Sequence, residues 1–109
     1  MKIQLGEFEE VVLLTVGVLH GNAYAVTIKD EIEHRLNREV TVGALQVTLR
    51  RLESKGFLKS KLGESNEMRR GRPKLFFEMT AYGKKALVHT KESRDQLWSA
   101  LPKLVLKLK

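Results

Sequence analysis

The sequence predicts an α+β domain, mainly α, in which three helices are followed by a β-hairpin and a last helix. Apolar residues recur at helical spacing in three successive segments within residues 5–55. Two short segments with strand-like composition, 57–62 and 75–79, then flank a polar, glycine-containing stretch. A further helical segment covers about 81–101. The length of 109 residues fits this single arrangement.

The first two helices are expected over residues 5–19 and 24–36. Glutamates near the start of the first segment suit the positive end of a helix dipole. That segment is also apolar at Leu14 and Val18, outside a single stripe, so we expect it to be buried on more than one side. The second segment has an apolar residue at every fourth position, and Asn37 is its expected end.

The third helix is expected over about 43–55. Thr41 can act as its N-cap, because a hydroxyl accepts from the free backbone N–H groups of a first turn. Gly56 is the expected left-handed residue that ends it. The buried face is predicted to consist of Leu45, Leu49 and Leu52.

The β-hairpin is expected to have a long basic tip over residues 63–74. Thr80 can cap the last helix, and Pro102 disfavours its continuation. The tail after Pro102 alternates apolar residues with lysine, and its conformation is not predicted.

The composition excludes several functions. The chain has no cysteine, which rules out disulfides, iron–sulfur clusters and thiol chemistry. Without an apolar run long enough for a membrane span and without a visible leader, we expect a cytoplasmic protein. The three histidines lie far apart in the sequence, so no metal or other cofactor is predicted. Glu9 and Glu10 are expected on a helix surface with no base or nucleophile beside them, and no enzyme active site is predicted.

The positive charge is concentrated in one part of the chain. The net charge is +7, from 20 basic and 13 acidic residues. Residues 1–40 hold 4 basic and 7 acidic side chains, whereas residues 50–74 hold 9 basic and 3 acidic ones. A local basic stripe is typical of a protein that binds a polyanion. The alternative is a solvated face that only keeps the protein soluble.

The order of the elements favours the polyanion. A short segment, 38–42, joins the second and third helices, which is the helix-turn-helix arrangement whose second helix can enter the major groove of DNA. A basic hairpin after it is a wing. Gly43 and Ala44 allow a phosphate to approach the first turn of the third helix, where N–H groups favour an anion.

Two sequence blocks resemble the signatures of the PadR family of winged-helix transcriptional regulators. Thr41–Phe57 (TVGALQVTLRRLESKGF) resembles the small-residue helix start and the R-L-E-x-x-G-hydrophobic end of the family. Gly71–Leu87 (GRPKLFFEMTAYGKKAL) resembles the family's wing strand and L-T-x-x-G helix start, with Met79 in place of the leucine. His20–Val26 resembles the segment around a G-Y pair. Gln46 stands where family members often carry tyrosine.

The resemblance implies different functions for the two parts of the chain. Residues 1–80 would be the winged helix-turn-helix DNA-binding domain, with a two-stranded wing. Residues 81–109 would be a dimerisation helix and tail, as in the short branch of the family. The implied DNA-binding residues are Thr41, Gly43, Ala44, Gln46, Val47 and Arg50 in the third helix, and Arg69, Arg70, Arg72 and Lys74 in the wing.

Individual side chains have more specific expected roles. Glutamine at position 46 can bond the N6/N7 edge of adenine. Arg50 and Arg51 are adjacent and cannot point the same way, so Arg50 is expected on DNA, while Arg51 pairs with Glu53 or another acidic neighbour, or reaches a phosphate. The wing arginines are expected on phosphates rather than on base edges.

The implied function is a homodimeric transcriptional repressor of a nearby operon that binds a pseudo-palindromic operator. Leu97, Trp98 and Leu101 are candidates for the dimer contact and for a site of a small hydrophobic effector. In the first case Trp98 only packs in the dimer core, and in the second its ring stacks on a flat ligand. The alternative function is a winged-helix interaction module that binds an acidic protein partner.

Overall fold

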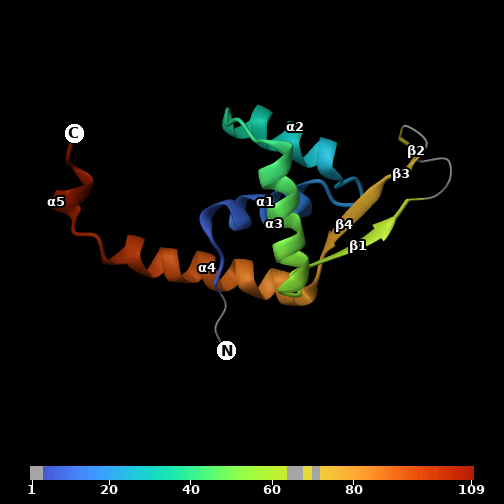
Figure 1. Ribbon diagram of the computed structural model, residues 1–109. Helices are drawn as coiled ribbons and strands as arrows, with labels where there is room; N and C mark the ends of the chain where they lie inside the picture. Colours follow the sequence, from blue (N-terminus) through green and yellow to red (C-terminus); the bar gives the residue numbers. More distant parts are fainter. Residues whose placement is uncertain (1–3, 64–67, 70–71) are drawn as a thin grey trace.

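The structure, a computed structural model, describes residues 4–63, 68–69 and 72–109. Its elements confirm the predicted fold class, a mainly helical winged helix-turn-helix (Figure 1). The helices are α1 (Glu7–Val18), α2 (Ala25–Leu36), α3 (Val42–Ser54), α4 (Ala81–Ala100) and α5 (Lys103–Leu106). The strands are β1 (Leu58–Leu62), β2 (Met68–Arg69), β3 (Arg72–Pro73) and β4 (Leu75–Met79).

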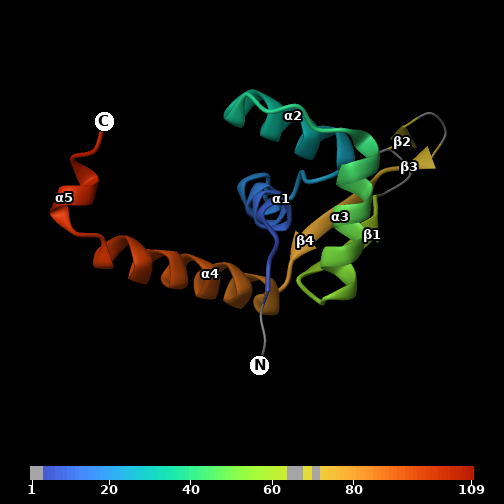
Figure 2. The same ribbon diagram turned by 60° about the vertical axis from the view of Figure 1, so that its left-hand side comes forward.

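The hydrophobic core surrounds α1, which contacts α2, α3, α4 and β4. Figure 2 shows α1 lying between α2 and α4. The leucine face predicted for α3 is buried against it, and the strands and the start of α4 close the remaining side. The buried apolar residues are Val12, Leu13, Val16, Ala23, Ile28, Ile32, Val40, Leu45, Leu49, Leu52, Phe57, Leu58, Phe77 and Ala86.

The wing is an antiparallel hairpin in which β1 pairs with β4, from Leu58 opposite Met79 to Leu62 opposite Leu75. The Phe77 amide donates to the Ala23 carbonyl at 2.8 Å, which fastens the hairpin to the loop before α2. A second short antiparallel pair, β2 with β3, was not predicted. The tip sequence lacks the apolar alternation by which strands are recognised.

The predicted helix ends are confirmed. The hydroxyl of Thr41 accepts from the Ala44 amide at 3.1 Å, and α3 is followed by Gly56 with φ +81°. The α4 helix begins after Thr80 and stops at Ala100, and Pro102 is the N-cap of the separate short helix α5.

The end of α3 and the start of α4 dock closely on each other. The Thr80 hydroxyl donates to the Gly56 carbonyl at 2.6 Å, and the Thr80 amide donates to the Phe57 carbonyl at 3.1 Å. The Gly83 backbone lies so near Phe57 that a Cβ on residue 83 would collide with the Phe57 carbonyl oxygen. Only glycine fits there, so position 83 fixes how α4 leaves the domain.

Glu9 is buried, and the prediction that it lies on a helix surface is wrong. Its side chain is 7% exposed and accepts hydrogen bonds from the Gly6 amide at 2.6 Å and from Lys55 Nζ at 2.8 and 3.0 Å. Burial raises the pKa of Glu9, but the bonds from Lys55 and Gly6 outweigh it and hold this pKa below its ordinary value. Helical periodicity could not reveal Lys55, which comes from the far end of α3.

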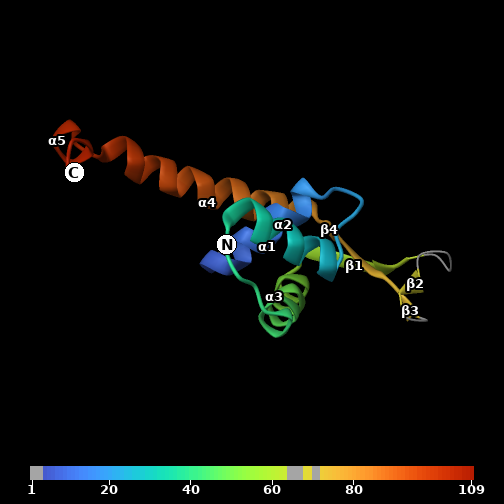
Figure 3. The same ribbon diagram turned by 90° about the horizontal axis from the view of Figure 1, so that it is seen from above.

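The α1 helix was expected to be buried on more than one side, but in the single chain one of its apolar sides is exposed. Leu14 and Val18 are 48% and 58% exposed. The α4 helix projects from the body, as Figure 3 shows, and all side chains from Lys91 onward are exposed. Within the described residues, no helix has the length and apolarity that crossing a membrane requires.

Replacement of Gly83 by alanine should destabilise the fold by about 3 kcal/mol, because the added methyl group must displace the backbone of Phe57. Urea unfolding at one fixed protein concentration measures this. Gly43→Ala is the matched control, since a Cβ there meets no atom within 4 Å and alanine favours the helix. Equal unfolding midpoints for Gly83→Ala and the wild type would contradict the close docking.

The Glu9–Lys55 pair should make stability depend on pH. Because the pKa of Glu9 is lowered in the folded state, its contribution is complete above about pH 4.5, the ordinary glutamate value, and is lost as the pH falls through the folded pKa. Glu9→Gln should lose about 1–2 kcal/mol at pH 7 and less at pH 3.5. Urea unfolding at both pH values tests this, with exposed Glu92→Gln as the control. A loss that is the same at both values would exclude the ionised pair as its cause.

Candidate nucleic-acid interface

The turn between α2 and α3 is held by two glutamates. Glu33 accepts hydrogen bonds from the Val40 amide and from Lys29 Nζ, both at 2.9 Å. The bond from Val40, and then that from Lys29, lowers the pKa of Glu33. Arg38 in the same turn makes two hydrogen bonds to Glu7 of α1, at 2.7 and 3.0 Å. The start of α3 is therefore fixed relative to both preceding helices.

The outer face of α3 is open to solvent. Leu45, Thr48, Leu49 and Leu52 face the core, and every DNA-binding residue predicted on this helix lies on the exposed side. Those residues are Thr41, Gly43, Ala44, Gln46, Val47 and Arg50. Space is free around Gly43, so a ligand backbone can approach the first turn.

A groove of about 510 Å³ runs between α3 and the wing. Its floor is apolar, and its rim carries polar and charged side chains from α3 and from the segment before β4. The lining residues are Tyr24, Ala25, Gln46, Leu49, Arg50, Glu53, Pro73, Lys74, Leu75 and Phe77. The groove thus brings together Gln46, Arg50 and Lys74, three predicted site residues from two separate elements.

Lys74 is fixed in this groove by an aromatic ring. Its Nζ lies 4.6 Å from the centre of the Tyr24 ring, within the range of a cation–π contact. The Tyr24 ring in turn packs edge-to-face on Phe76, with 5.4 Å between ring centres. Tyr24 was not among the predicted site residues, because the sequence showed it as an apolar position at the start of the second helix and as part of the segment that resembles the G-Y pair, with no sign of a partner in the wing.

Some basic side chains of the stripe over residues 50–74 are paired with acidic residues and are not free charges. Lys55 is bound to Glu9, and Lys59 lies 3.5 Å from Glu78 on the paired strand. Arg50, Arg51 and Lys61 make no ion pair within the described residues.

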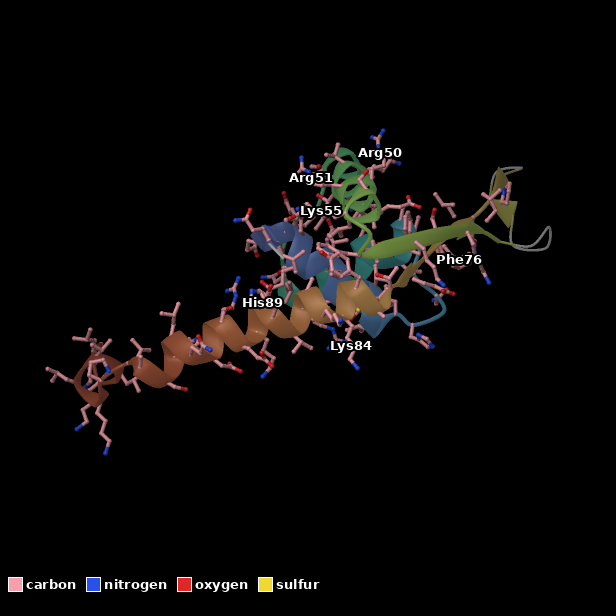
Figure 4. All side chains as sticks on the ribbon, turned by 90° about the horizontal axis from the view of Figure 1, so that it is seen from below. Arg50, Arg51, Lys55, Phe76, Lys84 and His89 are labelled. Atoms are coloured by element: carbon pink, nitrogen blue, oxygen red, sulfur yellow. The ribbon has the colours of Figure 1, made fainter. Side chains whose placement is uncertain are left out.

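Arg51 does not pair with Glu53, whose carboxylate instead accepts from the Ser60 hydroxyl at 2.6 Å. Figure 4 shows Arg50 and Arg51 on the outer side of α3, whereas Lys84 lies on the opposite side of the molecule. The two arginines are therefore available to a ligand on the α3 face.

The β2 and β3 strands, which contain Arg69 and Arg72, lie at the far end of the hairpin (Figure 1). Arg69 is opposite Arg72 in the β2–β3 pair. Arg70 lies outside the described residues. The structure therefore places Lys74 in the groove that Gln46 and Arg50 of α3 also line.

The second predicted site lies on α4. Leu97, Trp98 and Leu101 are 74%, 66% and 36% exposed. Trp98 also lines a cleft of about 340 Å³ between α1 and α4, across which Arg94 pairs with Glu10 at 2.8 Å. The other apolar residues of this cleft are Leu14, Leu87 and Val88. In the ranges that the structure describes, no three acidic or histidine side chains gather in a way that could hold a metal ion.

Known proteins resemble this chain in sequence and in fold. The transcriptional regulator PadR-like family matches residues 13–89. RosR of H. salinarum, solved as the hsRosR-S1 complex, gives a TM-score of 0.71 at 25% identity, covering 89% of this chain and 79% of that protein. A PadR-like transcription factor from Bacteroides fragilis gives 0.70 at 25% identity, covering 84% of each chain. No curated protein matches.

A third solved structure, a PadR family regulator from Eggerthella lenta, has the same fold, with a TM-score of 0.70 at 21% identity over 94% of this chain and 88% of that one. The family match extends from within α1, through α3 and the wing, into the first half of α4. It therefore includes both the groove and the α3–α4 docking. This chain belongs to the PadR-like family of transcriptional regulators and is a DNA-binding regulator.

Proposed function

We propose that the protein is a homodimeric repressor that binds a pseudo-palindromic operator near the genes it controls. Residues 1–80 bind DNA and residues 81–109 form the dimer. The two α3 helices enter successive major grooves about one helical turn apart. The single observation that carries this proposal is the groove in which Gln46, Arg50 and Lys74 face solvent together. Such a repressor works on chromosomal DNA, in the cytoplasm.

Each group of candidate DNA-binding residues has a distinct proposed role. Thr41, Gly43 and Ala44 let the DNA backbone approach the first turn of α3. Gln46 reads adenine, and Val47, which is 47% exposed, contacts a thymine methyl group. Arg50 reaches a base edge or a flanking phosphate. The wing residues, which contribute salt-dependent affinity through phosphate contacts, are Arg69, Arg70, Arg72 and Lys74.

The exposed apolar surface supports the dimer. A long helix with apolar side chains in water is unfavourable, and an apolar patch on a protein marks an interaction site. The exposed apolar residues of the C-terminal part are Val88, Leu97, Trp98, Leu101, Leu104, Val105 and Leu106, and those of α1 are Leu14 and Val18. The α4 helix of a second copy would cover both parts.

Release from DNA is proposed to follow the binding of a small hydrophobic effector beside Trp98. The cleft between α1 and α4 supplies apolar walls for such a ligand. The dimer can adopt conformations that differ in the separation of the two α3 helices. The effector changes their populations only if it binds one of these conformations more tightly than another. Trp98 could instead only pack in the dimer core. In that case, a ligand will change its fluorescence only by dissociating the dimer.

Membership of the PadR-like family favours DNA over an acidic protein as the partner. The test begins with DNA selected from a random pool by the wild-type protein. A selected consensus with two related half-sites would support the repressor. Capture of acidic proteins without retention of any DNA would favour the interaction module instead.

Arg50→Ala should weaken binding to the selected DNA by about tenfold, as expected for one lost base or phosphate contact. Each lost phosphate contact should also lower the slope of log K against log salt concentration by about 0.9, and Arg72→Ala should show this effect. Gel retardation at several salt concentrations measures both quantities.

Lys84→Ala is the matched control for Arg50→Ala, because it removes the same charge from the opposite side of the molecule (Figure 4). It should leave affinity nearly unchanged. If both variants weaken binding equally, net charge rather than the α3 face governs binding. A wild-type affinity that does not change with salt would contradict the proposed mechanism.

Leu97→Glu should convert the dimer to a monomer and weaken operator binding, because it places a charge in the proposed apolar interface. Sedimentation measures the oligomeric state. Trp98 is the only tryptophan of the chain, so its emission should shift to longer wavelength in the monomer. Lys85→Glu, exposed on the same helix outside the proposed interface, should stay dimeric. A monomeric wild type at micromolar concentration would refute the dimer.

A further inference from the structure

We propose that Tyr24 is a positioning residue for DNA binding, whose ring holds the Lys74 ammonium in the groove where a DNA phosphate is bound. The inference rests on the proposed function, because it takes nucleic acid to be the ligand of this groove. It adds a residue outside α3 and outside the wing to the binding machinery. It also gives a physical reason for the aromatic residues around the groove.

The arrangement combines the residue before α2, the residue before β4 and β4 itself. Tyr24 is the N-cap residue of α2, and Phe76 belongs to β4. The Tyr24 backbone is itself fixed, since its amide donates to the Thr27 hydroxyl at 3.0 Å. Phe76 packs edge-to-face on the Tyr24 ring, with 74° between the ring planes. The ring therefore presents one face to Lys74, whose Nζ lies 4.6 Å from its centre.

The charge of Lys74 is held without being neutralised. Among the described residues, no carboxylate lies within ion-pair distance of its ammonium group. Of the described residues that line the groove, only Glu53 is acidic, and its carboxylate accepts a hydrogen bond from Ser60. An aromatic face attracts the ammonium group and leaves its full charge available for an anion.

Positioning matters for lysine in particular. The lysine side chain has four rotatable bonds, and the entropy lost when binding immobilises it lowers the affinity for DNA. A ring that already holds the ammonium beside Arg50 removes part of that entropic loss. Tyr24→Leu should therefore weaken binding to the selected DNA by about threefold to tenfold. Tyr24→Phe retains the ring and should bind like the wild type.

A purely structural role for Tyr24 gives a different result. If the ring only packs the wing against α2, Tyr24→Leu weakens DNA binding whether or not Lys74 is present. If the ring acts through Lys74, the same change has no further effect in a Lys74→Ala background. A double-mutant cycle separates these cases.

The experiment uses the full chain and the selected DNA, with wild type, Tyr24→Phe, Tyr24→Leu, Lys74→Ala and the double variant Tyr24→Leu/Lys74→Ala. Lys74→Ala should lower the salt slope by about 0.9, the value for one lost phosphate contact. Lys61→Ala is the matched control, because it removes a charge from the same hairpin and, within the described residues, Lys61 makes no cation–π contact. Circular dichroism and thermal unfolding verify that each variant is folded.

The inference is upheld if Tyr24→Leu weakens binding only when Lys74 is present and Tyr24→Phe does not weaken it. It is overturned if the losses of DNA affinity from Tyr24→Leu and Lys74→Ala are additive. It is also overturned if Tyr24→Phe loses as much affinity as Tyr24→Leu, because that result would assign the role to the hydroxyl group. If the wild type retains no DNA at all, the proposed function fails, and that result differs from each of these.

Discussion

The carbonyl oxygen of Phe57 occupies the space that a side chain on residue 83 would need, so the start of α4 lies directly on the end of α3. Thr80 reinforces this contact by donating from both its hydroxyl and its amide to the carbonyls of Gly56 and Phe57. Close backbone packing of this kind has no side chain that could adjust. The docking therefore fixes where α4 leaves the domain, next to the segment that joins α3 to β1, while α3 itself packs against α1 and α2.

Electrostatics acts in two separate ways in this molecule. Some basic residues are used internally: Lys55 stabilises buried Glu9, and Arg38 ties the turn before α3 to Glu7. Others, such as Arg50 and Lys74, face solvent without an acidic partner within the described residues. The total charge of the chain does not distinguish these groups. Only the second group can exchange counterions for DNA phosphates, so the charge relevant to binding is smaller than the basic stripe suggests.

Local signals in the sequence predicted most of the fold, and contacts between distant segments were missed. Hydroxyl capping by Thr41 and the left-handed Gly56 each depend on a few neighbouring residues, so the sequence predicted both. The burial of Glu9 depends on Lys55, 46 positions away, and the cation–π contact of Tyr24 is made with a lysine in the wing. Such pairs leave no periodic pattern. The α3 face was predicted from the spacing of its leucines and from the family resemblance, but the groove that joins it to the wing was not.

The two halves of α4 are held by different contacts. This difference favours a mechanism in which DNA binding is regulated through the helix. Its first half is bound to the domain by Gly83 and Ala86, which are buried. Its second half contacts the domain mainly through the Arg94–Glu10 pair, and its apolar side chains are exposed. In the proposed dimer, the second half would take its orientation from the partner, and the tight docking at residue 83 would pass that orientation to the segment that follows α3. A ligand that changed the packing around Trp98 would then alter the separation of the two α3 helices without touching the DNA-binding face.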